Sequence, residues 1–89
     1  MQNNASIEGI RIGIVGSGVS GLSLASLANR KKARVFVSDS GAFRENAARK
    51  LESMGIAFEF EEHGPRLWES DLIVLSSGVA PTAVPVQEA

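Results

Sequence analysis

The chain has 89 residues, of which 44% are hydrophobic, and a formal net charge of −1. This length and composition are typical of one globular α/β domain, and the charge gives no overall field to attract nucleic acid or an anionic membrane. Because the sequence contains no cysteine, it excludes disulfides, thiolate metal sites and cysteine nucleophiles.

The N-terminal segment and the longest apolar runs bear on location. Residues 1–6 are polar, without the basic and apolar regions of a secretory signal, and we expect them to be disordered. No apolar run is long enough to cross a bilayer. We therefore expect a soluble, cytoplasmic protein with neither nucleic acid nor membrane as a partner.

The first half of the chain predicts two strands, each followed by a helix. Ile10–Val15 is almost wholly apolar, which is typical of a parallel strand covered on both faces. A helix over Ser20–Arg30 follows, and its basic end complements the helix dipole. The second strand is predicted over Arg34–Ser38. The second helix, over Phe43–Met54, ends at Gly55 in a left-handed cap.

The second half predicts two further strands. Ile56–Phe60 alternates apolar and acidic residues, which indicates a half-exposed edge strand, with Glu59, Glu61 and Glu62 on a solvated face. One helical turn over Arg66–Ser70 leads to a fourth strand over Leu72–Leu75, and we expect a loop from Val79 to Pro85. This order of elements predicts a Rossmann-like open parallel sheet with flanking helices in a single domain.

The turn after the first strand has the pattern Gly-x-Gly-x-x-Gly, from Gly16 to Gly21. In such a turn the first glycine allows the tight bend, the second lets the backbone approach a diphosphate, and the third allows close packing of the helix. Unpaired N–H groups and the positive end of the helix dipole then face the ligand. Asp39, eighteen positions after the last glycine, is placed to accept a hydrogen bond from a ribose hydroxyl or a base N–H. The combination predicts a nucleotide-phosphate site.

Three turns are expected to meet at the carboxyl ends of the strands, where open α/β sheets bind their ligands. The candidate nucleotide-binding residues in these turns are Gly16, Ser17, Gly18, Val19, Ser20, Gly21, Asp39, Ser40, Ser76, Ser77 and Gly78. Each also has a structural alternative. Asp39 and Ser20 are suited to cap a helix or turn, the other serines to turns, and Gly78 to a left-handed turn position.

No catalytic or metal-binding residue is predicted. His63 is the only histidine, and its polar loop favours solvent exposure over catalysis. Trp68 is expected to pack in the core or at the sheet edge, and Arg44 to lie on the surface of the second helix, with stacking on a base as the alternative. The chain has no phosphate loop with lysine, no histidine pair and no nucleophile beside a base, so we expect it to bind a ligand without transforming it.

Three segments together resemble the N-terminal domain of the Mur ligases, and among these the ligases that add D-glutamate to UDP-N-acetylmuramoyl-L-alanine in peptidoglycan synthesis. The segments are residues 12–23, 37–40 and 71–81. The last of them, Asp-Leu-Ile-Val-Leu-Ser-Ser-Gly-Val-Ala-Pro, is the most specific. The resemblance implies that residues 1–89 form a UDP-sugar-binding domain. It also implies that the central and C-terminal domains of the ligase are absent from this chain, which alone is expected to be inactive.

The resemblance also implies roles for single residues. Backbone N–H groups of Val19 and Ser20 would face the diphosphate region, Asp39 and Ser40 would contact uracil, and Gly78 would approach the diphosphate-sugar portion. No cofactor is expected in this domain, whereas ATP and Mg²⁺ are implied for the full-length ligase. The expected partners are UDP-N-acetylmuramoyl-L-alanine, or a related UDP-sugar, and the other domains of the parent chain.

Two positions depart from the family pattern. Ser77 stands where a proline is usual, and Gly41 stands where a basic residue often follows the Asp-Ser pair. The alternative interpretation is an NAD(P)-binding Rossmann module of a dehydrogenase or a ligand-sensing regulator. Such a module would use the same glycines and place Asp39 on an adenosine ribose.

Overall fold

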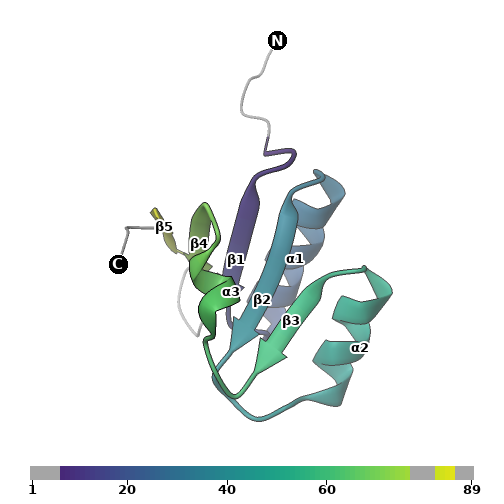
Figure 1. The fold of residues 1–89 in the computed structure, drawn as a ribbon. Coiled ribbons are helices and arrows are strands. Elements are labelled where there is room, and N and C mark those ends of the chain that lie inside the picture. Colours follow the sequence, from purple (N-terminus) through teal and green to yellow (C-terminus); the bar gives the residue numbers. More distant parts are fainter. Residues whose placement is uncertain (1–6, 77–81, 86–89) are drawn as a thin grey trace.

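Five strands form one sheet in the order β3-β2-β1-β4-β5, as Figure 1 shows. The structure is a computed structural model that describes residues 7–76 and the backbone of residues 82–85. The elements in chain order are β1 (Arg11–Val15), α1 (Val19–Arg30), β2 (Arg34–Asp39), α2 (Glu45–Ser53), β3 (Ala57–Phe60), α3 (Pro65–Trp68), β4 (Leu72–Leu75) and β5 (Thr82–Pro85).

The first four strands pair in parallel, as predicted. β1 lies at the centre of these pairings, between β2 and β4, and β3 forms one edge of the sheet. From β1 the chain runs outward through β2 to β3 and then returns to β4 on the other side of β1. The strand order therefore reverses beside β1, and such a switch point is where open α/β sheets leave a crevice.

Helices cover both faces of the sheet, because side chains of successive strand residues point to opposite faces. Ile12, Ile14 and Val37 belong to a core cluster with residues of α1 and α2. Phe36 and Ile73 pack on the other face against Leu67 of α3. Figure 1 shows α3 in front of β1 and β2, and α1 behind them.

Gly13 explains how a helix as short as α3 packs so closely on the sheet. A Cβ built on Gly13 would lie 2.6 Å from Ser70 Oγ and 2.7 Å from Leu67 Cδ1. Any side chain at this position would push α3 away from β1. Leu67 is 1% exposed, so the glycine allows α3 to close the core on this face.

The predicted loop before the C-terminus is wrong at β5. Backbone residues 82–85 pair antiparallel with β4, with Ile73 opposite Val84 and Leu72 opposite Pro85. This pairing satisfies the backbone hydrogen bonds of β4 on the side that does not face β1. A proline is tolerated in β5 because an edge strand needs no N–H on its outer side. The parallel sheet thus gains an antiparallel edge. Residues 1–6, Ser77 and Gly78 lie outside the described residues.

Two helices begin at other residues than predicted. Gly18, not Ser20, is the N-cap of α1, and no side chain caps that helix. Phe43 precedes α2 and packs edge-on against Phe60, with ring centroids 5.3 Å apart. Gly55 follows α2 with φ of +72°, which confirms the predicted left-handed cap. No helix in the described part of the chain has the length and apolarity to cross a bilayer.

Trp68 does not pack in the core. It is 57% exposed, whereas the neighbouring Leu67 is buried. α3 is a single turn, and successive helical residues point about 100° apart around the axis. The residue that faces the sheet is therefore Leu67, and the tryptophan lies on the surface.

Candidate nucleotide-binding crevice

A crevice of about 600 Å³ lies at the carboxyl ends of β1, β2 and β4. The structure thus brings together turns that are far apart in the sequence, as predicted. The predicted residues that line it are Gly16, Ser17, Gly18, Asp39, Ser40 and Ser76. Of the other candidates that the structure describes, Val19, Ser20 and Gly21 are not part of this lining.

The three glycines of the first turn differ in what surrounds them. Gly16 has φ of +108°, a conformation that favours glycine, and it makes the bend after β1. A Cβ on Gly21 would lie 2.0 Å from the Gly16 carbonyl oxygen, so α1 packs directly on the turn. A Cβ on Gly18 would meet no protein atom within 4 Å. The first and third glycines are thus required by the fold, and the second leaves open space beside the backbone.

The N-terminus of α1 presents uncompensated positive charge. Gly18 is the N-cap, no side chain accepts from the first N–H groups, and the first turn holds no acidic residue. The N–H groups at the start of a helix have no intrahelical acceptors, and the helix dipole makes this end positive. Val19 is 85% exposed and lines an adjoining pocket of about 510 Å³ together with Ser17 and Gly18. This end of α1 can therefore receive an anionic group.

Asp39 joins the turn after β1 to the turn after β2. Its Oδ2 accepts hydrogen bonds from the Ser17 N–H at 2.8 Å and the Ser17 hydroxyl at 2.6 Å. Its Oδ1 accepts from the Gly41 N–H at 2.7 Å. An ionised carboxylate has about four acceptor positions. One position therefore remains on Oδ1 for a further donor.

These contacts set the protonation of Asp39. Partial burial by itself raises the pKa of this carboxyl. The hydrogen bonds from Ser17 and Gly41, with the positive charge of Arg44, outweigh burial and hold the pKa below its ordinary value of 3.8. Asp39 is thus a carboxylate at neutral pH, and it acts as an acceptor.

Two of the predicted serines hold the crevice together. Ser17 is 1% exposed, and its hydroxyl donates to Asp39 while it accepts from Arg44 Nη2 at 2.8 Å. The Ser76 hydroxyl donates to the Val15 carbonyl oxygen at 2.8 Å. Both hydroxyls are therefore engaged within the protein, and Ser40, which is exposed, is the predicted serine of the lining whose side chain faces solvent.

Arg44 and His63 also line the crevice, although the sequence favoured a surface role for both. The guanidinium of Arg44 lies 3.9 Å from Asp39 Oδ2, so it brings a positive charge to the crevice wall. His63 is exposed, as predicted, but its Nδ1 lies 2.6 Å from the hydroxyl of the fully buried Ser38. In the sequence, Ser38 was the residue that could have indicated this contact, because a buried hydroxyl at the end of an apolar strand requires a hydrogen-bond partner.

Glu59 is not on a solvated face. Its Oε2 lies 2.5 Å from Ser38 Oγ and accepts from the Gly64 N–H at 2.8 Å. The alternation in this strand indicated an outward-facing glutamate, and it gave no information about the loop that folds back over it. Within residues 7–76 and 82–85, no three His, Cys, Asp or Glu side chains are grouped to hold a metal ion.

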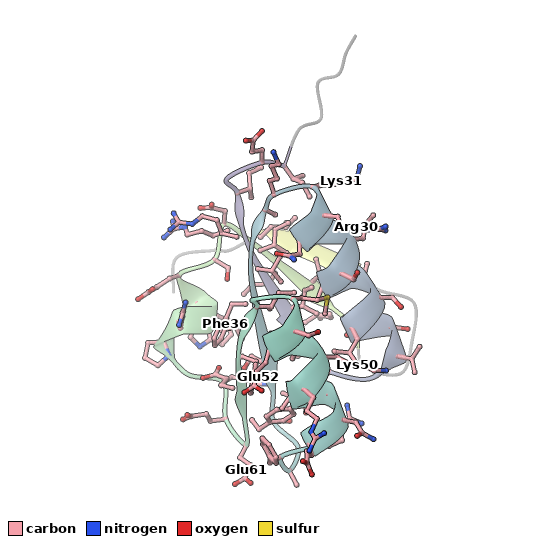
Figure 2. All side chains as sticks on the ribbon, turned by 90° about the vertical axis from the view of Figure 1, so that its right-hand side faces the viewer. Arg30, Lys31, Phe36, Lys50, Glu52 and Glu61 are labelled. Atoms are coloured by element: carbon pink, nitrogen blue, oxygen red, sulfur yellow. The ribbon has the colours of Figure 1, made fainter. Side chains whose placement is uncertain are left out.

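The basic cluster at the end of α1, which consists of Arg30, Lys31 and Lys32, is remote from the crevice. Figure 2 shows Arg30 and Lys31 at the end of α1 opposite to Glu61. The Glu61 N–H donates to the Asp39 carbonyl oxygen at 2.7 Å, which places Glu61 beside the crevice. Arg30 lies in the last turn of α1 and Lys31 is its C-cap, and positive charge at this position complements the negative end of the helix dipole.

The lowered pKa of Asp39 predicts how pH changes stability. A carboxyl whose pKa is lower in the folded state than in the unfolded state stabilises the fold at pH values above the unfolded-state pKa. This stabilisation is lost as the pH falls through the folded-state pKa. We expect wild type to exceed Asp39→Asn in free energy of unfolding by about 1–3 kcal/mol at pH 7. The difference should shrink below pH 3.8. Urea unfolding of both proteins between pH 7 and 2.5 measures it, and a constant difference contradicts the assignment.

The chain matches a family model described as the MurD N-terminal domain over residues 11–84. It is 39% identical over 77 residues to a UDP-N-acetylmuramoylalanine–D-glutamate ligase of Pelodictyon phaeoclathratiforme, which covers 86% of this chain and 17% of the relative. The enzyme of the same name from Chlorobaculum parvum is 33% identical over 86 residues, covering 97% of this chain and 18% of the relative. The chain therefore spans less than a fifth of the length of these relatives.

Among solved structures, the HOCl-induced flavoprotein disulfide reductase RclA from Escherichia coli has a similar fold. The TM-score is 0.55 at 19% sequence identity, over 91% of this chain and 21% of that one. This likeness agrees with the Rossmann-like fold expected from the sequence. The family itself is shown by the match over residues 11–84: the chain belongs to the family of MurD N-terminal domains.

Proposed function

We propose that this domain binds the uridine diphosphate part of UDP-N-acetylmuramoyl-L-alanine for a cytoplasmic ligase that adds D-glutamate. The observation that carries the proposal is the juxtaposition of two complementary features. An uncapped helix N-terminus at Gly18 and a carboxylate with one free acceptor position at Asp39 lie on the same crevice. The first suits an anion and the second suits a neutral group that donates a hydrogen bond.

The diphosphate would lie at the start of α1. Gly18 leaves open space beside its Cα, so a phosphate oxygen can approach the backbone without meeting a side chain. The N–H groups of Val19 and Ser20 follow directly, and they have no side-chain acceptor. Arg44 supplies a positive charge on the crevice wall, which offsets the absence of a basic residue directly after Ser40.

Uracil would lie against Asp39 and Ser40. A uracil ring joined to ribose has a single ring N–H, and the carboxylate of Asp39 has one acceptor position left, on Oδ1. The alternative, a dinucleotide held by both carboxylate oxygens on a ribose diol, would require Oδ2, which Ser17 occupies twice. The hydrogen bonds of Asp39 therefore match the single ring N–H of uracil and disfavour a dinucleotide whose ribose is held through both carboxylate oxygens.

The chemical step would belong to the rest of the parent protein. The relatives named as D-glutamate ligases are more than five times as long as the matched segment. We propose that their further domains bind ATP and Mg²⁺, and that the substrate carboxylate takes the terminal phosphoryl group of ATP to give an acyl phosphate and ADP. The amine of D-glutamate then attacks the acyl carbon, which forms the amide bond and releases inorganic phosphate. The role of this domain is to hold the nucleotide end of the substrate.

Calorimetric titration of the 89-residue chain tests the proposal. UDP-N-acetylmuramoyl-L-alanine, UDP and NAD are titrated in parallel into the same preparation. We expect heat of binding with both uridine ligands and none with NAD, because the one acceptor position left on Asp39 matches the single ring N–H of uracil. Binding of NAD alone, or of none of the three ligands, would contradict the proposed function.

A further inference from the structure

Three side chains beside the crevice form a hydrogen-bonded group that the proposed function does not use. Ser38, at the end of β2, is fully buried. Its Oγ lies 2.5 Å from Glu59 Oε2, 2.6 Å from His63 Nδ1 and 3.0 Å from the Glu62 carbonyl oxygen. We refer to Ser38, Glu59 and His63 as the Ser38 cluster. His63 is the member that lines the crevice.

The number of protons in the cluster determines which tautomer His63 adopts. A serine hydroxyl has one proton to donate. Ser38 Oγ faces two acceptors, Glu59 Oε2 at 2.5 Å and the Glu62 carbonyl oxygen at 3.0 Å, so its single proton is directed to this side and to the closer oxygen of Glu59. The Ser38 oxygen can then only accept from the imidazole at 2.6 Å. Nδ1 of His63 therefore carries a proton, which in the neutral ring leaves Nε2 as an acceptor.

The loop that carries His63 is held against the neighbouring turn. The Glu61 N–H donates to the carbonyl oxygens of Asp39 at 2.7 Å and Gly41 at 3.0 Å. The Gly64 N–H donates to Glu59 Oε2 at 2.8 Å. Backbone contacts therefore fix the loop on both sides of His63, and Ser38 fixes the ring. An exposed side chain held in this way loses little entropy when it binds a ligand.

We propose that His63 is a binding residue for the nucleoside end of the ligand, and that its Nε2 accepts a hydrogen bond from a ribose hydroxyl. The inference rests on the proposed function. His63 shares the crevice wall with Asp39 and Ser40, on the side of β2 and β3 rather than at the N-terminus of α1. Asp39 offers its remaining acceptor position to the base, so a second acceptor on the same wall suits the adjoining sugar. Ser38 is a positioning residue that acts through His63.

Deoxynucleotides test this hydrogen bond. UDP, 2′-deoxy-UDP and 3′-deoxy-UDP are titrated into wild type, His63→Ala and the control Glu62→Gln, whose exposed side chain is in the same loop. In wild type and the control, one deoxy ligand should bind about fivefold more weakly than UDP. In His63→Ala that difference should disappear. Equal binding of all three ligands to wild type, or discrimination that persists in His63→Ala, would overturn the inference.

The tautomer provides a readout that does not depend on a ligand. His63 is the only histidine in the chain, so its imidazole ¹⁵N signals are unambiguous. We expect the Nδ1-protonated form in wild type and a mixture of tautomers in Ser38→Ala. A predominant Nε2-protonated form in wild type would overturn the proton assignment. If wild type binds no UDP, the proposed function fails together with this inference. If UDP binds and His63→Ala still discriminates UDP from the deoxy ligands, only the role of His63 is removed.

Discussion

Gly18→Val is expected to abolish binding of the UDP-sugar and to leave the domain folded. A Cβ on Gly18 meets no protein atom within 4 Å, so the valine would occupy the open space of the proposed diphosphate site. Loss of two charge-assisted hydrogen bonds, each about 1.5–3 kcal/mol, corresponds to roughly 100-fold weaker binding or more. The free energy of unfolding should fall by about 1 kcal/mol, because valine is a poor N-cap residue. Calorimetric titration and thermal unfolding measure the two effects separately.

Ser23→Val is the matched control for this substitution. Ser23 is an exposed residue of the same helix, and it is not part of the crevice lining. The control adds the same β-branched side chain to α1 and should bind the ligand like wild type. If Gly18→Val unfolds the domain without a separate loss of binding, or binds normally, Gly18 does not face the ligand.

Gly21→Ala is expected to lower the stability of the fold itself, whereas Gly18→Val is expected to remove binding from a folded domain. The added Cβ would lie 2.0 Å from the Gly16 carbonyl oxygen and 2.9 Å from Ser76 Oγ. The first of these contacts is to backbone, so α1 must move away from the turn. Overpacking in a tight core costs about 1–3 kcal/mol and at times more. We expect a loss of about 3 kcal/mol or more, measured by urea unfolding.

Gly18→Ala is the control for Gly21→Ala, because the same methyl group is added three residues away. In an ordinary helix interior, alanine in place of glycine stabilises by about 0.5–1 kcal/mol. Gly18 is the N-cap of α1, where alanine is a poorer residue than glycine, so the Gly18 variant should lose about 1 kcal/mol at most, well below the loss expected for Gly21→Ala. A Gly21→Ala variant as stable as wild type would show that α1 can shift without loss of packing, and that the third glycine of the motif is dispensable.

The sequence was sufficient wherever the determinants are local. The parallel strands followed from short apolar runs, and the left-handed cap at Gly55 from a glycine placed after an amphipathic helix. The turn from Gly16 to Gly21 was recognised because each glycine has a separate steric reason within a few residues. The convergence of the turns on one crevice also followed, because parallel strands end at the same edge of a sheet.

The tertiary structure decided how the side chains at that edge are used. Asp39 binds Ser17, twenty-two residues away, and Ser38 binds His63, twenty-five residues away. Such contacts depend on how two loops fold toward each other, which periodicity and propensity do not encode. For the same reason, the sequence did not predict the fifth strand or the exposure of Trp68. The residues that could form the nucleotide site were thus evident from the sequence. Which of their donors and acceptors are used within the protein, and which are left for a ligand, is decided by how the loops pack together.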